Sequence, residues 1–402
     1  MNLQKSSERL VRSRFPHLHG GLFVARIGVV AILTRFEKLT DPRVERTKWH
    51  LLLDMVTIAL CGAICGADSW VDVEKFGVAK WGWFARFLDL PNGIPSHDTF
   101  GRVFARLDTQ EFMMCVQNWL RSLHLSLKEQ GVAIDGKTLR GAVDAASGKS
   151  ALHVVSAWAS GLRLSLGQVA VDGKSNEITA VPKLLELLEL TGAVVTMDAM
   201  HCQKDTLKAI RAKDADYLIA VKDNQPKLHT LLHDLFTEYG ERNYKAPGLR
   251  SFRTVERNRG RDEMRICYVA PAPAALKTHP EWTDVKSVVM VYRECRRNGK
   301  ESNEVAFFIS SLPPKAKRIA RYVRGHWGIE NTLHWTLDVI FSEDKSRIRK
   351  GSGPEIASIF RKLALMVLQR DTSSKGSLRG KRLQAGWNED FLERVLCGFS
   401  GK

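Results

Sequence analysis

The sequence predicts a mixed α/β fold with a helical N-terminal part, and three observations lead to it. Residues 36–126 carry apolar side chains at helical spacing, with turn residues between the helices. At about residue 130 the period changes, and the elements then run three strands, helix, strand, helix, strand. After a β-rich stretch, helical character returns from about residue 315 to 370. This order is that of a ribonuclease-H-like mixed sheet flanked by helices.

We expect five parts along the chain. They are a basic N-terminal arm over 1–35, a helical domain over 36–126, a ribonuclease-H-like core over 130–225 and 315–370, a β-rich insertion over 226–314, and a basic C-terminal tail over 371–402. Asp41 and Pro42 resemble the start of the first helix. The helical domain has basic faces, which suit DNA binding and equally suit a plain packing domain.

The charge of the chain indicates a polyanionic partner. The 402 residues carry a net charge of +17, which favours nucleic acid or an anionic membrane surface. The apolar stretch at 22–33 is interrupted by Arg26 and is too short to span a bilayer, so we expect no membrane partner. Seven dispersed cysteines without a CxxC pair argue against a zinc knuckle and are typical of a reduced, cytosolic protein.

Two aspartates follow apolar strands of the predicted core. Asp135 comes after the apolar run 132–134, and Asp198 ends the apolar run 193–197. Neighbouring strands would bring both carboxylates to the same edge of the sheet. A third acid, Glu330, lies on the helical stretch 324–338 at the border of its apolar face. Three carboxylates can hold two Mg²⁺ ions roughly 4 Å apart for phosphodiester chemistry.

Each acid also has a plainer interpretation. A strand-end aspartate commonly caps a turn, and Asp198 could do so before the helix at 204–213. Glu330 could be a solvated helix residue paired with Arg324 or Lys345. A zinc site of His326, Glu330 and His334 is disfavoured, because the two histidines are eight residues apart, about 12 Å along a helix.

Basic and amide side chains surround these acids in the sequence. We expect them to contact DNA, with a solvated basic face as the plain alternative. The candidates are Lys137, Arg140, Lys222, Asn224, Gln225, Arg324, His326, Trp327 and Arg347.

Short motifs then allow comparison with a known family. They lie at residues 95–100, 134–138, 174–178, 197–204, 222–225 and 326–338. On these motifs, the chain over roughly 36–370 resembles the DDE transposases of bacterial insertion sequences, in particular the ISAs-type family that includes the H-repeat-associated proteins. The resemblance implies Mg²⁺-dependent cutting and joining of DNA at terminal inverted repeats, with Asp135, Asp198 and Glu330 as the triad.

The resemblance also implies partners and leaves alternatives open. Mn²⁺ could substitute for Mg²⁺, the protein would act in the bacterial cytoplasm on the nucleoid, and a homodimer on double-stranded DNA would serve two element ends. The wider superfamily places Tyr, Arg and Lys around its glutamate, whereas this chain has Val323, His326 and Leu337 there. That departure leaves Asp338, or Glu343 with Asp344, as alternative third acids. A catalytically silent DNA-binding remnant, or a nuclease without strand transfer, are the alternative functions.

Overall fold

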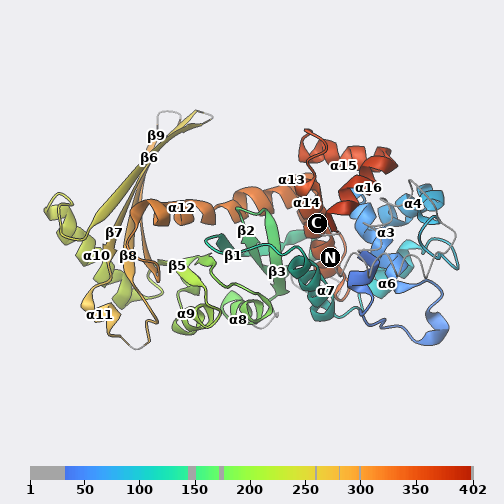
Figure 1. Ribbon diagram of the computed structural model, residues 1–402, viewed down its shortest axis with the longest axis horizontal. Helices are drawn as coiled ribbons and strands as arrows, with labels where there is room; N and C mark the ends of the chain where they lie inside the picture. Colours follow the sequence, from blue (N-terminus) through green and yellow to red (C-terminus); the bar gives the residue numbers. More distant parts are fainter. Residues whose placement is uncertain are drawn as a thin grey trace.

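The computed structural model describes residues 32–143, 151–171, 176–258, 260–279, 281–297 and 300–399. Three parts follow one another along the long axis of the molecule (Figure 1). Strands β6–β9 with helices α10 and α11 form one end, strands β1–β5 with α8 and α9 form the middle, and the N- and C-terminal helices form the other end. The predicted arm over 1–35 falls mostly outside the described residues.

A single nine-stranded sheet connects the middle of the molecule to the insertion. Its strand order is β3-β2-β1-β4-β5-β9-β8-β7-β6. The strands are β1 (Gly131–Leu139), β2 (Leu152–Ala159), β3 (Leu164–Ala170), β4 (Val194–Met197), β5 (Asp216–Val221), β6 (Arg250–Asn258), β7 (Arg261–Pro271), β8 (Ser287–Arg297) and β9 (Lys300–Ser310).

The first five strands confirm the ribonuclease-H-like core. β1, β2 and β3 form an antiparallel meander, and β4 and β5 add to β1 in parallel. Parallel strands need crossovers, which α8 (Glu177–Leu187) and α9 (Lys204–Arg211) supply. All four residues of β4 are buried, as expected of a strand covered on both faces.

The two faces of the sheet pack on different helices. Val195 and Met197 of β4 belong to the large core that includes α8 and α9, whereas Val194 packs in a second core with α12 (Ala316–His326). Alternate residues of a strand point to opposite faces, so the apolar run of β4 serves both cores. Helix α12 therefore lies on the face opposite α8 and α9, and it runs from the insertion toward the C-terminal helices (Figure 1).

The β-rich insertion continues the sheet of the core. β9 pairs antiparallel with β5 over four residues, and β8, β7 and β6 follow in turn. Two helices, α10 (Pro226–Glu241) and the short α11 (Ala274–Lys277), accompany these strands. β6 and β7 pair as an antiparallel hairpin, and Gly260, just before β7, has the positive φ of +72° that glycine adopts readily.

The N-terminal part is helical, as predicted. Its helices are α3 (Leu52–Cys65), α4 (Trp70–Ala79), α5 (Trp81–Phe84), α6 (His97–Phe104) and α7 (Thr109–Ser122), preceded by the short η1 (Glu45–Thr47). The helix start predicted at Asp41 and Pro42 is wrong. The carboxylate of Asp41 instead accepts a hydrogen bond from the backbone of Arg43 and forms an ion pair with its guanidinium, so it stabilises a bend.

The C-terminal part contains the remaining helices. They are the π-helix η5 (Ile329–His334), α13 (Trp335–Ile340), η6 (Glu343–Lys345), α14 (Gly353–Arg370), α15 (Leu378–Trp387) and α16 (Glu389–Leu396). The prediction of a tail over 371–402 is wrong for the described residues of that range. Helix α15 packs on α3 and on α16, and Phe391 and Leu392 of α16 are buried. Among the described helices, no single one meets the length and hydropathy needed to cross a membrane, while α3 and α4 do so only as a pair bent by 96°.

Candidate active site

Asp135 and Asp198 lie side by side where two parallel strands part. The pairing of β1 with β4 ends at Ile134 and Met197, and the two aspartates are the next residues on their strands. Asp135 remains paired with Ser156 on β2, so its backbone is fixed, while Asp198 opens the short turn η4 (Ala199–His201). The side chain of Asp198 makes no capping hydrogen bond to that turn, which argues against a purely local role.

Glu330 lies on a distorted helix that contacts β1. It lies in the π-helix η5, between α12 and α13. Such single π turns are rare and occur often at functional sites. The glutamate is exposed, while its neighbours Ile329 and Leu333 are buried against the core. Its charge is close enough to Asp135 to act on the pKa of that carboxyl.

The charges of Asp198 and Glu330 both act on Asp135. Burial raises the pKa of Asp135 to about 6, and the charges of Asp198 and Glu330 add to the increase, while His326 opposes it. The pKa of Asp198 is instead lowered, first by its hydrogen bond with His326 and also by Lys222. A carboxylate that is costly to ionise beside two others is the kind of group that a divalent cation stabilises.

Two histidines from the same helical stretch flank the aspartates. Nε2 of His326 lies 3.4 Å from Oδ1 of Asp198, and its Nδ1 lies 3.0 Å from the hydroxyl of Thr196. Nδ1 of His334 lies 3.6 Å from Oδ2 of Asp135. Burial, together with the charges of Lys362 and Lys137, lowers the pKa of His334 to about 3, so this imidazole is neutral. His326 thus holds Asp198 by a hydrogen bond, while the neutral ring of His334 lies beside Asp135.

The acids that are alternatives to Glu330 surround the ammonium of one lysine. The ammonium of Lys137 forms ion pairs with Asp338 and with Glu343, and it lies 3.9 Å from Asp344. Glu343 is buried, and the charge of Lys137 helps to hold its pKa below the usual value in spite of that burial. Among the acids of this stretch, Glu330 is the one whose charge acts on Asp135. The same contacts place Lys137 inside the protein rather than on a DNA-facing surface.

A buried lysine supports the strand behind Asp135. Lys362, on α14, donates a hydrogen bond of 2.7 Å to the hydroxyl of Ser156, the cross-strand partner of Asp135. Its ammonium also contacts Gln168 of β3. Burial lowers the pKa of Lys362 to about 8. The sequence pattern could not single out this residue, because a lysine within an apolar helix is usually assigned to its solvent face.

The amides expected to hold DNA are engaged by the protein. The side chain of Asn224 donates to the carbonyl of Ala199 at 2.7 Å, and that of Gln225 donates to the carbonyl of Cys202 at 2.8 Å. Both carbonyls belong to the turn that follows Asp198. These amides therefore support the Asp198 turn from the loop after β5.

The remaining predicted contacts differ in exposure. Lys222, Arg140 and Arg347 are exposed. Arg324 is half-exposed and forms an ion pair with Glu256 of β6, so it connects α12 to the insertion. Trp327 is 47% exposed at the end of α12, three residues before Glu330, and is free to stack on a ligand.

A cluster that sequence reasoning did not assign lies next to Asp135. Glu177, the first residue of α8, lies between two histidines. Its Oε1 is 2.6 Å from Nε2 of His153, and its Oε2 is 3.2 Å from Nε2 of His201. The motif at 174–178 contains Glu177, but the sequence spacing of His153, Glu177 and His201 does not predict that they contact one another.

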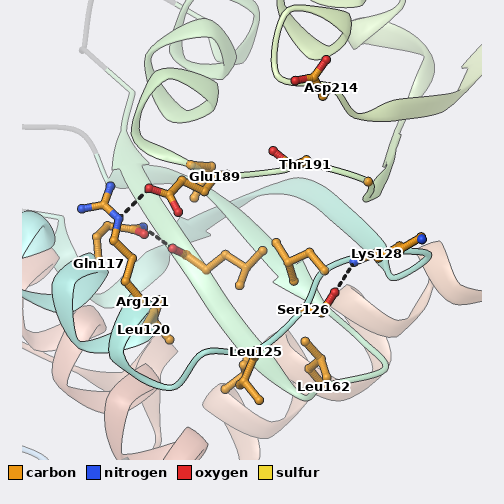
Figure 2. Close-up of a pocket in the computed structure, with 15 residues that line it drawn as sticks. Gln117, Leu120, Arg121, Leu125, Ser126, Lys128, Leu162, Glu189, Thr191 and Asp214 are labelled. Carbon is orange, nitrogen blue, oxygen red and sulfur yellow. Dashed lines mark hydrogen bonds and ion pairs between the residues drawn. The ribbon is translucent and has the colours of Figure 1, made fainter. Parts of the chain in front are cut away.

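Two hollows of the described surface do not contain the three acids. One, of about 680 Å³, lies among leucines between α7, β3 and the α8–β4 loop, beside the Arg121–Glu189 ion pair (Figure 2). The other, of about 340 Å³, lies between α12 and the insertion sheet and is lined by Arg324 and Trp327. The side chain of Asp198 is 60% exposed and Glu330 is exposed, so the carboxylate site is open to solvent on that side.

The donor set fits hard divalent cations. Carboxylate oxygens are the ligands that Mg²⁺ prefers. Within the described ranges, no three His, Cys, Asp or Glu side chains are gathered closely enough to hold an ion as they stand. The exposed side chain of Glu330 has the freedom to approach the two aspartates. Asp135, Asp198 and Glu330 are therefore the residues that could hold a metal at this edge.

Comparison with known proteins gives one consistent result. A family model described as "DDE_Tnp_1-associated" matches residues 33–120, and one described as "Transposase DDE domain" matches residues 126–367. The chain is 38% identical to "Putative transposase YncI" of Escherichia coli O157:H7, over 93% of this chain and 96% of that protein. It is 37% identical to "H repeat-associated putative transposase YhhI" of Escherichia coli strain K12, over 87% of this chain and 93% of that protein.

A solved structure is also similar, at a lower level. A piggyBac transposase synaptic complex with hairpin DNA aligns with a TM-score of 0.42 and 10% identity, over 98% of this chain and 80% of that chain. That likeness is too low to argue from, and the fold described above rests on the strand order itself.

Proposed function

The chain belongs to the DDE transposase family, and from that premise we propose that it cuts DNA at the ends of an insertion sequence and joins the freed 3′ ends to a target. The DDE domain implies dependence on a divalent metal, generally Mg²⁺, and the family acts on DNA. The observation that carries the proposal is the meeting of Asp135 and Asp198 at the point where β1 and β4 part.

The proposed triad is Asp135, Asp198 and Glu330. Two parallel strands hold the first two acids, and the π turn presents the third. His326 holds Asp198 by a hydrogen bond, and the ring of His334 beside Asp135 stays neutral, so that it does not compete with a cation. When bound, two Mg²⁺ ions supply an activated oxygen nucleophile and stabilise the leaving oxygen of the phosphodiester.

The proposed DNA path follows the exposed cations and the tryptophan near the triad. Lys222 lies close enough to Asp198 to lower its pKa, and Trp327 precedes Glu330 by three residues. Arg140, directly after β1, and Arg347, shortly after η6, are further exposed cations. Contacts of this kind to phosphates give binding that weakens steeply with salt.

The test uses the full chain and a duplex that carries an element end with its flanking DNA. With Mg²⁺ the parent should release a 3′-hydroxyl at the end and join it to a second duplex. Asp198→Ala should abolish both steps, whereas Asp205→Ala, the same change at an exposed position on α9, should not. Intact DNA with the parent, or equal cutting by Asp198→Ala, would overturn the proposal.

The same experiment separates the alternative functions. Cutting without a joined product identifies a nuclease that lacks strand transfer, and DNA binding without cutting identifies a silent remnant. We further propose that two copies act together on two element ends, in the bacterial cytoplasm at the nucleoid. Sedimentation of the chain with and without an end duplex tests the dimer. Substitution of Mn²⁺ for Mg²⁺ in the cutting reaction tests the breadth of metal use.

A further inference from the structure

Gly136, the residue after Asp135, lies directly against a side chain from another element. A Cβ at this position would lie 2.5 Å from Nε2 of His153 and closer still to the carboxylate of Glu177. A Cβ this close would force the side chains of Glu177 and His153 to move, so the glycine lets the carboxylate of Glu177 lie over the strand. The backbone that carries Asp135 and the carboxylate of Glu177 are therefore in contact.

Glu177 joins the two strands that carry the aspartates. One oxygen accepts from His153 on β2, and the other ring nitrogen of that histidine lies 2.8 Å from the hydroxyl of Thr138 on β1. The second oxygen of Glu177 meets His201, the last residue of the turn that Asp198 opens. His201 is 1% exposed, so this contact is removed from solvent.

The geometry points to Glu177 as a positioning residue that sets the separation of Asp135 and Asp198. We propose that its carboxylate, held between His153 and His201, keeps the two like-charged aspartates close enough to bind a divalent cation. This inference rests on the proposed function of the site and assigns it a fourth acid that does not itself touch the metal or the DNA.

Three observations favour this role over a plain helix-start glutamate. The partial positive charge at the N-terminus of α8 would stabilise an acid there even if its side chain pointed into solvent. Both carboxylate oxygens of Glu177 are instead directed to histidines of other elements. Asp135 and Asp198 directly follow the last paired residues of two neighbouring strands, and two carboxylates held this close repel each other, so the pair needs an external restraint. The hydrogen bond from His201 and the charge of His153 also keep the pKa of Glu177 low, so it remains an acceptor for both rings.

The test measures metal binding as well as cutting. Glu177→Gln keeps the shape of the side chain and removes its charge, and Glu186→Gln makes the same change at an exposed position of the same helix. Binding of Mn²⁺ by the full chain is followed by the loss of the free-ion electron paramagnetic resonance signal. We expect Glu177→Gln to raise the Kd for Mn²⁺ and the half-saturating Mg²⁺ for cutting by about tenfold, as loss of a supporting partner of a ligand typically does.

Other readouts separate positioning from loss of the fold. The melting temperature and the affinity for duplex DNA without metal should change little in Glu177→Gln, and cutting at saturating Mg²⁺ should largely recover. Gly136→Ala, which displaces the Glu177 carboxylate by direct contact, should show the same weakened Mn²⁺ binding. Unchanged Mn²⁺ affinity in both variants would overturn the inference. If the parent binds Mn²⁺ but never cuts DNA, the proposed function fails, while the comparison of Mn²⁺ affinities still decides the role of Glu177.

Discussion

The Nζ atom of Lys137 lies 2.9 Å from Oε2 of the buried carboxylate of Glu343. This contact joins β1, two residues after Asp135, to the short turn η6 that follows α13. Asp338 shares the same ammonium. The strand that holds one proposed catalytic acid and the helical stretch that holds another are thus connected by a buried ion pair behind the site.

Lys137→Ala should destabilise the protein by about 3–5 kcal/mol, because it leaves the buried charge of Glu343 without its partner. Urea unfolding at neutral pH measures the loss. The pKa of Glu343 is lowered in the folded state, so its contribution to stability is present above its unfolded pKa and is lost as the pH falls. The deficit of the variant should therefore shrink in acid. A variant as stable as the parent at neutral pH would contradict this role.

Asp135→Asn should stabilise the metal-free protein above pH 6. The folded pKa of about 6 exceeds the ordinary 3.8, so the folded state retains a proton that the unfolded state releases, and stability falls as the pH rises from about 4 to 6. About two pKa units correspond to at most about 3 kcal/mol. Thermal melts in EDTA at pH 8 and pH 4 should show the gain at the higher pH only. If Asp135→Asn were less stable than the parent at pH 8, the ionised carboxylate of Asp135 would not destabilise the metal-free fold.

Glu330→Gln and Asp338→Asn should separate the third acid from its alternatives. Loss of a metal ligand should reduce cutting by more than about 100-fold, since loss of a mere supporting partner costs 10–100-fold. Asp338→Asn should retain cutting within about tenfold, because Glu343 still holds Lys137. Single-turnover cutting at saturating DNA provides the comparison. The reverse order of the two variants would transfer the role of third acid to Asp338.

Lys222→Ala should weaken DNA binding without affecting the fold. The side chain is exposed, and its charge acts on Asp198. Loss of one phosphate contact should lower the slope of log K against log salt by about one. Lys245→Ala, an exposed lysine beyond α10, serves as the control and should leave the slope unchanged. Equal slopes for the parent and Lys222→Ala would remove Lys222 from the DNA path.

Much of the core could be predicted because its signals are local. The apolar runs before Asp135 and Asp198 identify buried strands, and the order of elements then determines that these strands are neighbours. The position of Glu330 at the border of the apolar face of the stretch 324–338 likewise predicts that this stretch packs on the core. Ile329 and Leu333 are indeed buried, and His326 and His334 of the same stretch lie 3.4 Å from Asp198 and 3.6 Å from Asp135.

The unpredicted features depend on contacts between distant residues. Glu177 meets histidines 24 residues away on either side, and Lys362 reaches Ser156 across 206 residues, so no local pattern contains them. The π turn adds a residue to a helix whose composition is ordinary. The polar composition of the C-terminal helices conceals them in the sequence, although in α16 Phe391 and Val395, like Leu392 and Leu396, are four residues apart, which is the spacing of a buried face.

The hydrogen bonds between β5 and β9 make the insertion inseparable from the core. Removing residues 226–314 would strip one side of β5 and leave the backbone groups of residues 218–221 as a bare edge, a template for aggregation. The same cut would also remove β6 and β7, which form part of the surface on which α12 packs, and so would weaken the support of the helix that leads into the Glu330 turn. A minimal catalytic fragment of this protein therefore has to retain the insertion. The insertion cannot be deleted or replaced as an independent domain.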